Sequence, residues 1–527
     1  MRNKQKGLAQ SSVIVMSSLV ISRVTGFLRD TLIRNTLPEF ESDAFFSALR
    51  ITDLMYNLLI GGAIVAALIP LLTGYLVKDE EEEGWKAVST FMNLIMLGMV
   101  VFCFAGVLFS PQIAGLYKFS EEKRALVAAL SKILFPSVGF LMLAGLTNGV
   151  AYSYKNYSSA AFGPTVYNLG TIISLLGFSR YGVEKVSIGF MCSAFVFFVF
   201  QFTLVYKNFK YYRPSLFLKH PGFKTLINLA IPSLAISSIA QINLLISTIY
   251  TSSYSEGSLS AYTNASNLWQ LPYGIFAMGL GTVLLPTLSE KSVKADSKGF
   301  RHLIVRSVKM ILLLIVPSAV GIVLLGVPII SVVYKWSDQV NAGSILQINT
   351  ILTYFPLALI SQSVLAIITR VFYAQSDTKT PFIYGFLSIL LNGIFCYAFS
   401  FIKSIDAGGM SLAYSLQSVI YTLILIKTLN KEHKFNRTGF LRFSSKIIIA
   451  TLVMGLIVYG LNHFFSPDYL GEISLYRKIL EILFLLFQIG IGALVYFAVL
   501  FLLKQEEATY LIRLARGKLK RCLRVNA

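Results

Sequence analysis

The first two strongly apolar stretches of this chain are interrupted by charge. The charged residues in them are Arg23, Arg29, Asp30, Arg34, Asp43, Arg50 and Asp53. A charge at membrane depth costs roughly 2.5–3.5 kcal/mol even on the most lenient insertion scale. Such charges persist where they face a water-filled cavity or one another, and they then commonly mark the path of a substrate or an ion. We therefore expect a transport protein whose N-terminal helices line a polar cavity.

Composition supports a membrane protein and excludes several other classes. The chain has 527 residues, of which 55% are hydrophobic and only 13% charged, whereas a soluble protein is roughly one quarter charged. The apolar runs are continuous rather than alternating, which excludes an outer-membrane barrel. The net charge of +21 comes from basic residues in loops and at the chain ends, so it does not indicate nucleic-acid binding. The four cysteines and four histidines show no metal-site or disulfide spacing, and we expect no metal and no cofactor.

The apolar runs predict an all-α membrane protein with fourteen transmembrane helices. The predicted spans are 8–33, 43–76, 87–109, 126–153, 160–179, 186–206, 225–253, 259–289, 304–330, 344–373, 381–402, 408–428, 443–465 and 478–503. An even number of spans places both termini on one side of the membrane. The loops on that side, and the tail that begins at Lys504, carry most of the lysine and arginine. The positive-inside rule therefore predicts that both termini are cytoplasmic.

Short motifs recur at an offset of roughly 216–221 residues, which predicts an internal repeat. Residues 133–136 (ILFP) recur as 353–356 (TYFP), and Gly163-Pro164 recurs as Thr380-Pro381. The repeat predicts two six-helix lobes, residues 1–220 and 221–435, related by a pseudo-two-fold axis along the membrane normal. Two extra C-terminal helices occupy residues 436–503, and 504–527 form a basic cytoplasmic tail. Transporters built in this way hold substrate between lobes that rock against each other.

The densest motif is residues 22–30, with the sequence SRVTGFLRD. Gly26 within a membrane helix permits a bend or the close approach of another helix. Arg23 and Arg29 could then face one cavity, and the planar guanidinium fork is suited to grip a diphosphate. In an alternative interpretation, Arg29 and Asp30 only pair with neighbours near the outer interface while Arg34 snorkels to it.

At this motif the chain resembles a known family. Residues 22–30 and the sequence DAFF at 43–46 resemble the start of the MurJ family (also called MviN) of lipid II flippases, within the multidrug/oligosaccharidyl-lipid/polysaccharide exporter superfamily. Residues 279–289 (GLGTVLLPTLS) and 372–381 (FYAQSDTKTP) resemble two later signatures of that family. The resemblance implies a transporter, not an enzyme, that moves undecaprenyl-diphosphate-linked peptidoglycan precursor from the cytoplasmic to the periplasmic leaflet of the bacterial inner membrane. The bilayer and cell-wall synthesis proteins are its implied partners.

The resemblance also implies site residues. Arg23 and Arg29 match the family's diphosphate-binding arginines in its first helix, and Asp30 and Asp43 match its acidic positions. Two further family arginines are missing here, because their positions fall at Tyr56 and Asn267. We expect Asn267 to contribute to diphosphate binding, and Tyr56 and Gly26 to serve in gating or positioning. Arg50 is a candidate replacement for the first of these. The last two helices resemble the family's apolar groove for the lipid tail.

Three other interpretations stay open from the sequence. The chain could flip a different polyprenyl-linked oligosaccharide or export drugs, although those relatives usually have twelve helices. It could be a membrane enzyme, but the first two helices contain no His or Cys, and no HExxH or GxSxG motif occurs. It could also be a scaffold that has lost transport.

Asp30 and Asp43 are predicted to act at a gate near the outer end, paired with Arg29, Arg34 or Arg50.

Overall fold

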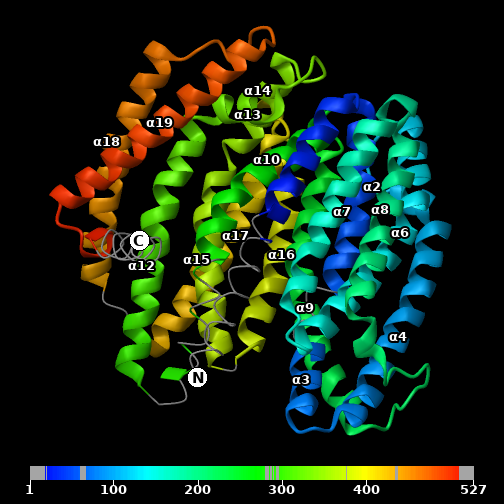
Figure 1. The fold of residues 1–527 in the computed structure, drawn as a ribbon. Coiled ribbons are helices and arrows are strands. Elements are labelled where there is room, and N and C mark those ends of the chain that lie inside the picture. Colours follow the sequence, from blue (N-terminus) through cyan, green and yellow to red (C-terminus); the bar gives the residue numbers. More distant parts are fainter. Residues whose placement is uncertain are drawn as a thin grey trace, which may run out of the picture. The chain divides into compact units, whose positions relative to one another are not determined.

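A computed structural model describes residues 18, 21–59, 67–278, 280, 284, 288, 290–291, 296–375, 377–433 and 437–509. Every regular element in these described ranges is helical, as the continuous apolar runs predicted. The chain divides into two compact units, Met1–Ser260 and Ala261–Ala527. Each unit is a bundle of long helices (Figure 1).

The first unit begins with a helix over residues 21–36. The elements that follow it are α2 (Glu39–Leu59), α3 (Ile69–Val77), α4 (Glu81–Leu108), α5 (Ser110–Ala114), α6 (Glu121–Ser153), α7 (Tyr157–Phe178), η2 (Ser179–Tyr181), α8 (Val183–Val205), η3 (Tyr206–Phe209) and α9 (Pro221–Thr251).

Helix α10 (Ser258–Pro272) starts at the boundary of the two units, and its last residue is followed directly by the π-helical turn η4 (Tyr273–Met278). The remaining elements of the second unit are α12 (Ser297–Leu324), α13 (Gly326–Tyr334), α14 (Ala342–Leu352), α15 (Phe355–Ala374), α16 (Lys379–Phe399), η5 (Lys403–Ile405), α17 (Gly408–His433), α18 (Arg437–Phe465) and α19 (Leu475–Leu502).

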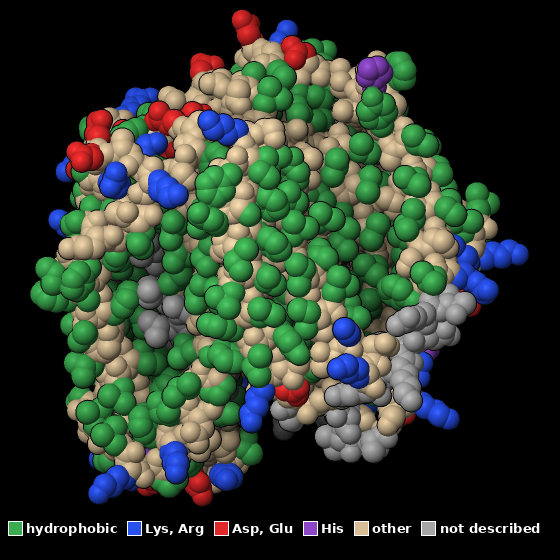
Figure 2. Space-filling view, turned by 180° about the vertical axis from the view of Figure 1, so that it is seen from behind, with side chains coloured by type: hydrophobic (Ala, Val, Ile, Leu, Met, Phe, Trp, Pro, Cys, Tyr) green, Lys and Arg blue, Asp and Glu red, His purple; other side chains and the backbone are tan. Residues whose placement is uncertain are grey.

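Ten helices in the described ranges are long and apolar enough to cross a membrane. Hydrophobic side chains cover the middle of the face shown in Figure 2, and lysine and arginine gather toward its ends. This distribution is what a bilayer requires of a protein that spans it. The all-helical membrane class is therefore supported, while the total of fourteen spans stays a prediction.

Two predicted spans are interrupted in the structure. The span predicted over 304–330 ends at Leu324, and α13 begins at Gly326. The span predicted over 344–373 is divided between α14 and α15, which begins with Phe355-Pro356. Proline at the second position of a helix lacks the amide hydrogen that would continue the preceding helix. Pro356 thus marks a helix boundary inside a predicted span, whereas Pro136 lies inside the continuous helix α6.

Helices α7 and α8 pack through small residues. A Cβ atom on Gly170 would come within 2.7 Å of the Ser193 hydroxyl, and one on Gly189 would clash with the Ser174 hydroxyl. Lipid tails offer no hydrophobic force to drive membrane helices together, so helix pairs depend on close packing. Small residues allow that close approach. This close pair positions α7, which carries a residue of the site described below.

In the second unit, a buried ionic cluster attaches α19 to α13. Lys478 donates hydrogen bonds to Glu481 (2.6 Å) and to the carbonyl and hydroxyl of Ser331 (both 3.1 Å). Lys335 donates to the carbonyl oxygens of Tyr469 and Gly471 in the turn before α19. Lys478 and Glu481 are at most 3% exposed, so each charge depends on the other for solvation.

The compact units and the predicted repeat divide the chain at different places. Helix α9 packs with α2 and α4 and therefore belongs to the first unit. The repeat assigns the same residues to a lobe that begins at residue 221. Packing contacts do not measure internal symmetry, so the lobes 1–220 and 221–435, the helix pair 436–503 and the tail 504–527 stay predictions.

Candidate functional site

Arg29 and Asp30 form an ion pair on the first helix. The Nε and Nη2 atoms of Arg29 both lie 2.8 Å from Asp30 Oδ1. The Nη1 group donates to Asn168 Oδ1, on α7, at 3.3 Å. The side chains of Arg29 and Asp30 are 23% and 14% exposed, so the pair is held in place yet remains accessible. The predicted partnership of Arg29 with Asp30 is confirmed.

Asn168 fixes the backbone next to this pair. Its Nδ2 group donates to the carbonyl of Ser22 (2.9 Å) and to the hydroxyl of Thr25 (3.3 Å). A Cβ atom on Gly26 would lie 3.2 Å from Nδ2. The helix continues through Gly26 over residues 21–36, so this glycine serves the close approach of Asn168 rather than an interruption of the helix.

Three more charged residues lie on the same two helices. Arg50 on α2 is half-buried, and Asp53 one turn later is exposed. Arg50, Arg29 and Asp30 all lie close enough to Asp53 to act on its charge. The first helix and α2 therefore bring two arginines and two aspartates into one charged site. Arg23 precedes Arg29 by six residues and is exposed.

Two predicted site residues are not brought into this group by the described contacts. The side chain of Tyr56 lies outside the described residues. Asn267 is half-buried on α10 in the second unit, where it has contacts of its own. Their roles stay predictions.

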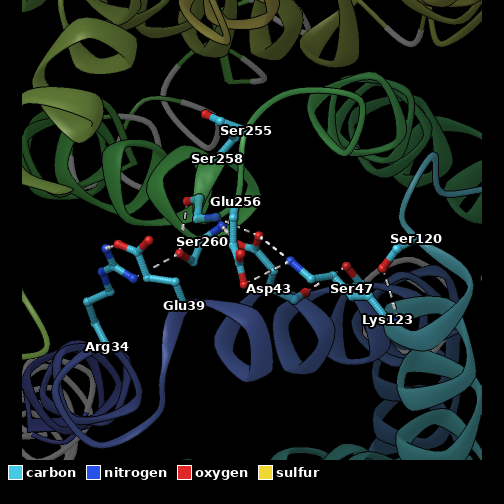
Figure 3. A network of polar contacts seen from close by, with 11 residues as sticks. Arg34, Glu39, Asp43, Ser47, Ser120, Lys123, Ser255, Glu256, Ser258 and Ser260 are labelled. Atoms are coloured by element: carbon cyan, nitrogen blue, oxygen red, sulfur yellow. Dashed lines mark hydrogen bonds and ion pairs between the residues drawn. The ribbon is translucent and has the colours of Figure 1, made fainter. Parts of the chain in front are cut away.

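Asp43 is the centre of a second polar network in the first unit, shown in Figure 3. Its carboxylate accepts hydrogen bonds from the backbone amides of Gly257 and Ser260, each at 2.8 Å, and from Lys123 Nζ at 3.3 Å. The amides belong to the first turn of α10 and the residue before it, where helical N–H groups lack internal partners. A carboxylate there is favoured by the helix dipole as well. Asp43 is 1% exposed.

Lys123 is the ion-pair partner of Asp43, and the prediction of an arginine partner for Asp43 was wrong. Lys123 is 7% exposed at its side chain, and a second carboxylate, Glu256, lies 3.8 Å from its Nζ. Its ammonium also lies over the rings of Phe40 (4.8 Å) and Phe119 (5.1 Å), a placement that stabilises a desolvated cation. The first turn of α6 provides this lysine, 80 residues after Asp43.

Arg34 extends the same network. Its Nη2 donates to Glu39 Oε1 at 2.7 Å and its Nη1 to the Ser260 hydroxyl at 3.3 Å. The arginine side chain has no solvent exposure. The alternative in which Arg34 snorkels to the interface is therefore wrong, because Glu39 begins α2 close enough to satisfy the guanidinium inside the protein.

Sequence reasoning missed three residues that complete these networks: Asn168, Lys123 and Glu39. Asn168 is a lone amide in a predicted apolar span, which is a signal that could have been used. Lys123 and Glu39 lie in segments predicted as loops, where a charged residue is unremarkable. In the part of the chain that the structure describes, no three His, Cys, Asp or Glu side chains gather as a metal site would need.

Comparison with known proteins places this geometry in context. A family model described as "Lipid II flippase MurJ" matches residues 39–479. A "Probable lipid II flippase MurJ" of Rhizobium tropici is 28% identical over 513 residues, which cover 94% of each chain. The protein of the same description from Vibrio cholerae is 26% identical, over 87% of this chain and 90% of that one. A "Lipid II flippase MurJ" of Burkholderia cenocepacia is 25% identical, over 88% and 91%.

Solved structures agree on the fold. The structure titled "Lipid II flippase MurJ, inward closed conformation" matches with a TM-score of 0.75 and 24% identity, over 92% of this chain and 98% of that one. An inward-facing multidrug resistance transporter of the MATE family matches less closely. Its TM-score is 0.65 at 14% identity, over 82% of this chain and 98% of the other. At these identities the likeness concerns the fold alone.

Proposed function

This chain belongs to the MurJ family of lipid II flippases, and from that premise we propose that it carries lipid-linked peptidoglycan precursor across the bacterial inner membrane. The cargo is undecaprenyl-diphosphate-linked, and it moves from the cytoplasmic to the periplasmic leaflet by alternating access. The observation that carries the proposal is an accessible arginine held between Asp30 and Asn168 on the helix over residues 21–36. The family is one of transporters rather than enzymes.

Arg29 and Arg23 are proposed to bind the diphosphate. Arg29 uses three of its N–H groups on Asp30 and Asn168, and a guanidinium has five. Two donors therefore remain for phosphate oxygens while the ion pair fixes the orientation of the fork. Asp30 balances the arginine charge when the site is empty, which limits the cost of a cation at membrane depth. Arg50 adds positive charge from α2.

Asn168 is proposed as a positioning residue. It joins the Arg29 side chain to the Ser22 carbonyl and the Thr25 hydroxyl. Loss of its amide would free the guanidinium to adopt other rotamers. Binding of the diphosphate should then weaken while the charge of the site is unchanged.

The test is complementation of a strain depleted of its lipid II flippase. Arg23→Ala and Arg29→Ala should each abolish growth while expression and membrane insertion persist. Arg29→Lys should restore growth only in part, because an ammonium lacks the bidentate fork. Arg180→Ala removes an arginine from the turn η2 outside the site and is the matched control, expected to grow normally. Full activity of both site variants would overturn the assignment.

The Asp43 network is proposed as a latch at the outer end of the transport path. Asp43 joins α2 to the turn between α9 and α10, which the predicted topology places on the periplasmic side. Breaking these bonds would let the turn move away from α2. If the ion pair with Lys123 is the functional element, Asp43→Lys combined with Lys123→Asp should recover growth that Asp43→Lys alone abolishes. Failure of the swap with both proteins present in the membrane would exclude the ion pair as the functional element and leave the amide bonds of Gly257 and Ser260, which a lysine at position 43 cannot accept, as the latch.

The chain is a multi-pass protein of the inner membrane by its family and its spans. We propose that both termini are cytoplasmic, that cell-wall synthesis proteins are partners, and that residues 436–503 contact the lipid tail.

The alternative function is transport of another polyprenyl-linked oligosaccharide or of drugs. Arg29 distinguishes the proposed cargo from a drug, because a drug without phosphate would gain little from a guanidinium fork. Competition by an added polyprenyl diphosphate for transport in reconstituted vesicles separates a polyprenyl-diphosphate-linked cargo from a drug.

A further inference from the structure

A spanning helix of the second unit contains an arginine that belongs to neither network described above. Arg370 lies in α15 (Phe355–Ala374), a helix long and apolar enough to cross a membrane. Four residues follow it before the helix ends, a rise of about 6 Å. The predicted topology places that end of the helix on the cytoplasmic side. A charge at this depth needs water or an opposite charge around it.

The inner part of α15 has an apolar side and a polar side. Its apolar residues are packed inside the unit, each at most 7% exposed: Val364, Leu365, Ile367, Ile368, Val371 and Phe372. Between residues 362 and 374 only four residues are half-buried, and all four are polar: Gln362, Thr369, Arg370 and Tyr373. At 3.6 residues per turn these four fall within a sector about 100° wide. A side that faced lipid would be apolar, so this sector faces water.

The polar side of α15 continues onto α17, which packs against it. Gln362 donates through its Nε2 group to the Ser418 hydroxyl at 2.9 Å and to the Tyr414 hydroxyl at 3.4 Å. The two helices therefore form one polar surface within the second unit, and Arg370 is its charged member.

The side chain of Arg370 points away from the nearer membrane boundary. Its Nη1 group donates to the carbonyl oxygen of Ala366, one turn earlier, at 2.7 Å. Ala366 lies eight residues before the helix end, about 12 Å along the axis. An arginine that snorkels would extend toward the close end of the helix instead. The guanidinium is thus held toward the middle of the membrane.

The charge of Arg370 is not balanced within the described part of the chain. No described residue forms an ion pair with it. Asp377, the nearest carboxylate in the sequence, accepts the backbone N–H of Thr380 at 3.0 Å. Tyr373 lies near enough to interact with the charge, but a neutral phenol does not offset a cation. The bond to Ala366 uses one of the five N–H groups of a guanidinium, so four are left among the described contacts for an anionic ligand.

We propose that Arg370 binds the diphosphate of the lipid-linked cargo in the cytoplasmic half of the transport path. This inference rests on the flippase function proposed above, and it adds a binding residue from the second unit. The Arg29–Asp30 pair is neutral overall, whereas a diphosphate carries at least two negative charges. Arg370 supplies net positive charge, and its planar fork can hold two phosphate oxygens at once.

The test is a titration of the purified full-length protein in detergent with undecaprenyl diphosphate, followed by microscale thermophoresis. Arg370→Gln should weaken binding at least about tenfold, the loss expected for one hydrogen bond to a charged group. Binding of undecaprenol, which has the same chain without phosphate, should be unchanged. Arg370→Lys keeps the charge but not the fork, so it should lose about threefold. If the glutamine variant does not fold, the lysine variant decides by the same comparison. Arg301→Gln, on α12 of the same unit, is the matched control and should bind like the parent.

Four outcomes would overturn the proposal. Unchanged diphosphate binding by folded Arg370→Gln, while Arg29→Ala loses it, would exclude Arg370 and leave the flippase function standing. An equal loss of undecaprenol binding would assign Arg370 to the structure of the helix pair. Competition by phosphatidylglycerol at concentrations equal to those of the diphosphate would indicate a general phosphate site. A parent protein that binds undecaprenyl diphosphate no more tightly than undecaprenol would overturn the proposed function as well.

Discussion

Removing the charge of Asp43 should release the turn that precedes α10. Asp43→Asn keeps the size of the side chain but leaves one carbonyl oxygen in place of two carboxylate oxygens. That oxygen can still accept from one of the amides of Gly257 and Ser260, while the new NH₂ group faces the other amide or the Lys123 ammonium. Hydrogen bonds to a charged group contribute roughly 1.5–3 kcal/mol each. One is lost if the NH₂ group faces Ser260, two if it faces Gly257 and Lys123, and in either case the carboxylate charge is lost.

Lys123 offsets part of this loss. Glu256 lies 3.8 Å from its ammonium and two aromatic rings lie beneath it, so the cation is not left without compensation. We therefore expect a net cost near the lower end of the range for breaking a buried ion pair, about 3 kcal/mol. At roughly 1.4 kcal/mol for each factor of ten, the open form of the turn should become about 100-fold more populated.

The assay is the rate at which a maleimide labels a buried cysteine. Ser258→Cys, in a background without the native cysteines, places a thiol in the first turn of α10 at a position that is 1% exposed. When opening is fast and reversible, the labelling rate is proportional to the open population. Asp43→Asn should raise the rate about 100-fold in purified protein.

Two controls make the result specific. Glu41→Gln removes a charge from the same helix outside the network drawn in Figure 3, and it should leave the rate unchanged. A second reporter, Ser131→Cys, is fully buried on α6 and should stay protected if only the turn opens. A rate for Asp43→Asn within about threefold of the parent would refute the reasoning, because the carboxylate charge and the lost bonds would then contribute little.

Three further outcomes are expected. Glu481→Ala should lower the free energy of unfolding by about 3 kcal/mol, because Lys478 is left buried without its carboxylate. Glu472→Ala, at an exposed position, should leave the stability unchanged, and Lys478→Met with Glu481→Met should recover most of it. The stability of each variant is compared with that of the parent by the thermal midpoint in detergent. A cysteine at Ser255 should react with an impermeant reagent in intact cells, and reaction only after permeabilisation would reverse the predicted topology. Collapse of the membrane potential at constant sodium should slow transport in proteoliposomes, because each charge that moves across the membrane gains about 2.3 kcal/mol per 100 mV. Transport that follows only a sodium gradient would exclude the membrane potential as the energy source.

The sequence alone determined the class of protein and the placement of its elements. Continuous apolar runs must form helices in a bilayer, because no water is present there to satisfy exposed backbone groups. The apolar runs also predicted the positions of most helices, such as α6 and α16. The charge of Arg29 within such a run indicated that its side chain needs a polar environment. It also predicted the partnership of Arg29 with Asp30, because opposite charges on one apolar stretch gain by pairing with each other.

Only the tertiary structure decided which distant residues complete the sites. Asn168 reaches Arg29 across 139 residues, and Lys123 reaches Asp43 across 80. Hydropathy and helical period report which face of a helix is polar, but not which other helix packs against that face. A buried ion pair is specified by distances of a few ångströms between helices. That is why Asp43 is paired with a lysine from α6 and not with any of the arginines nearer to it in the sequence.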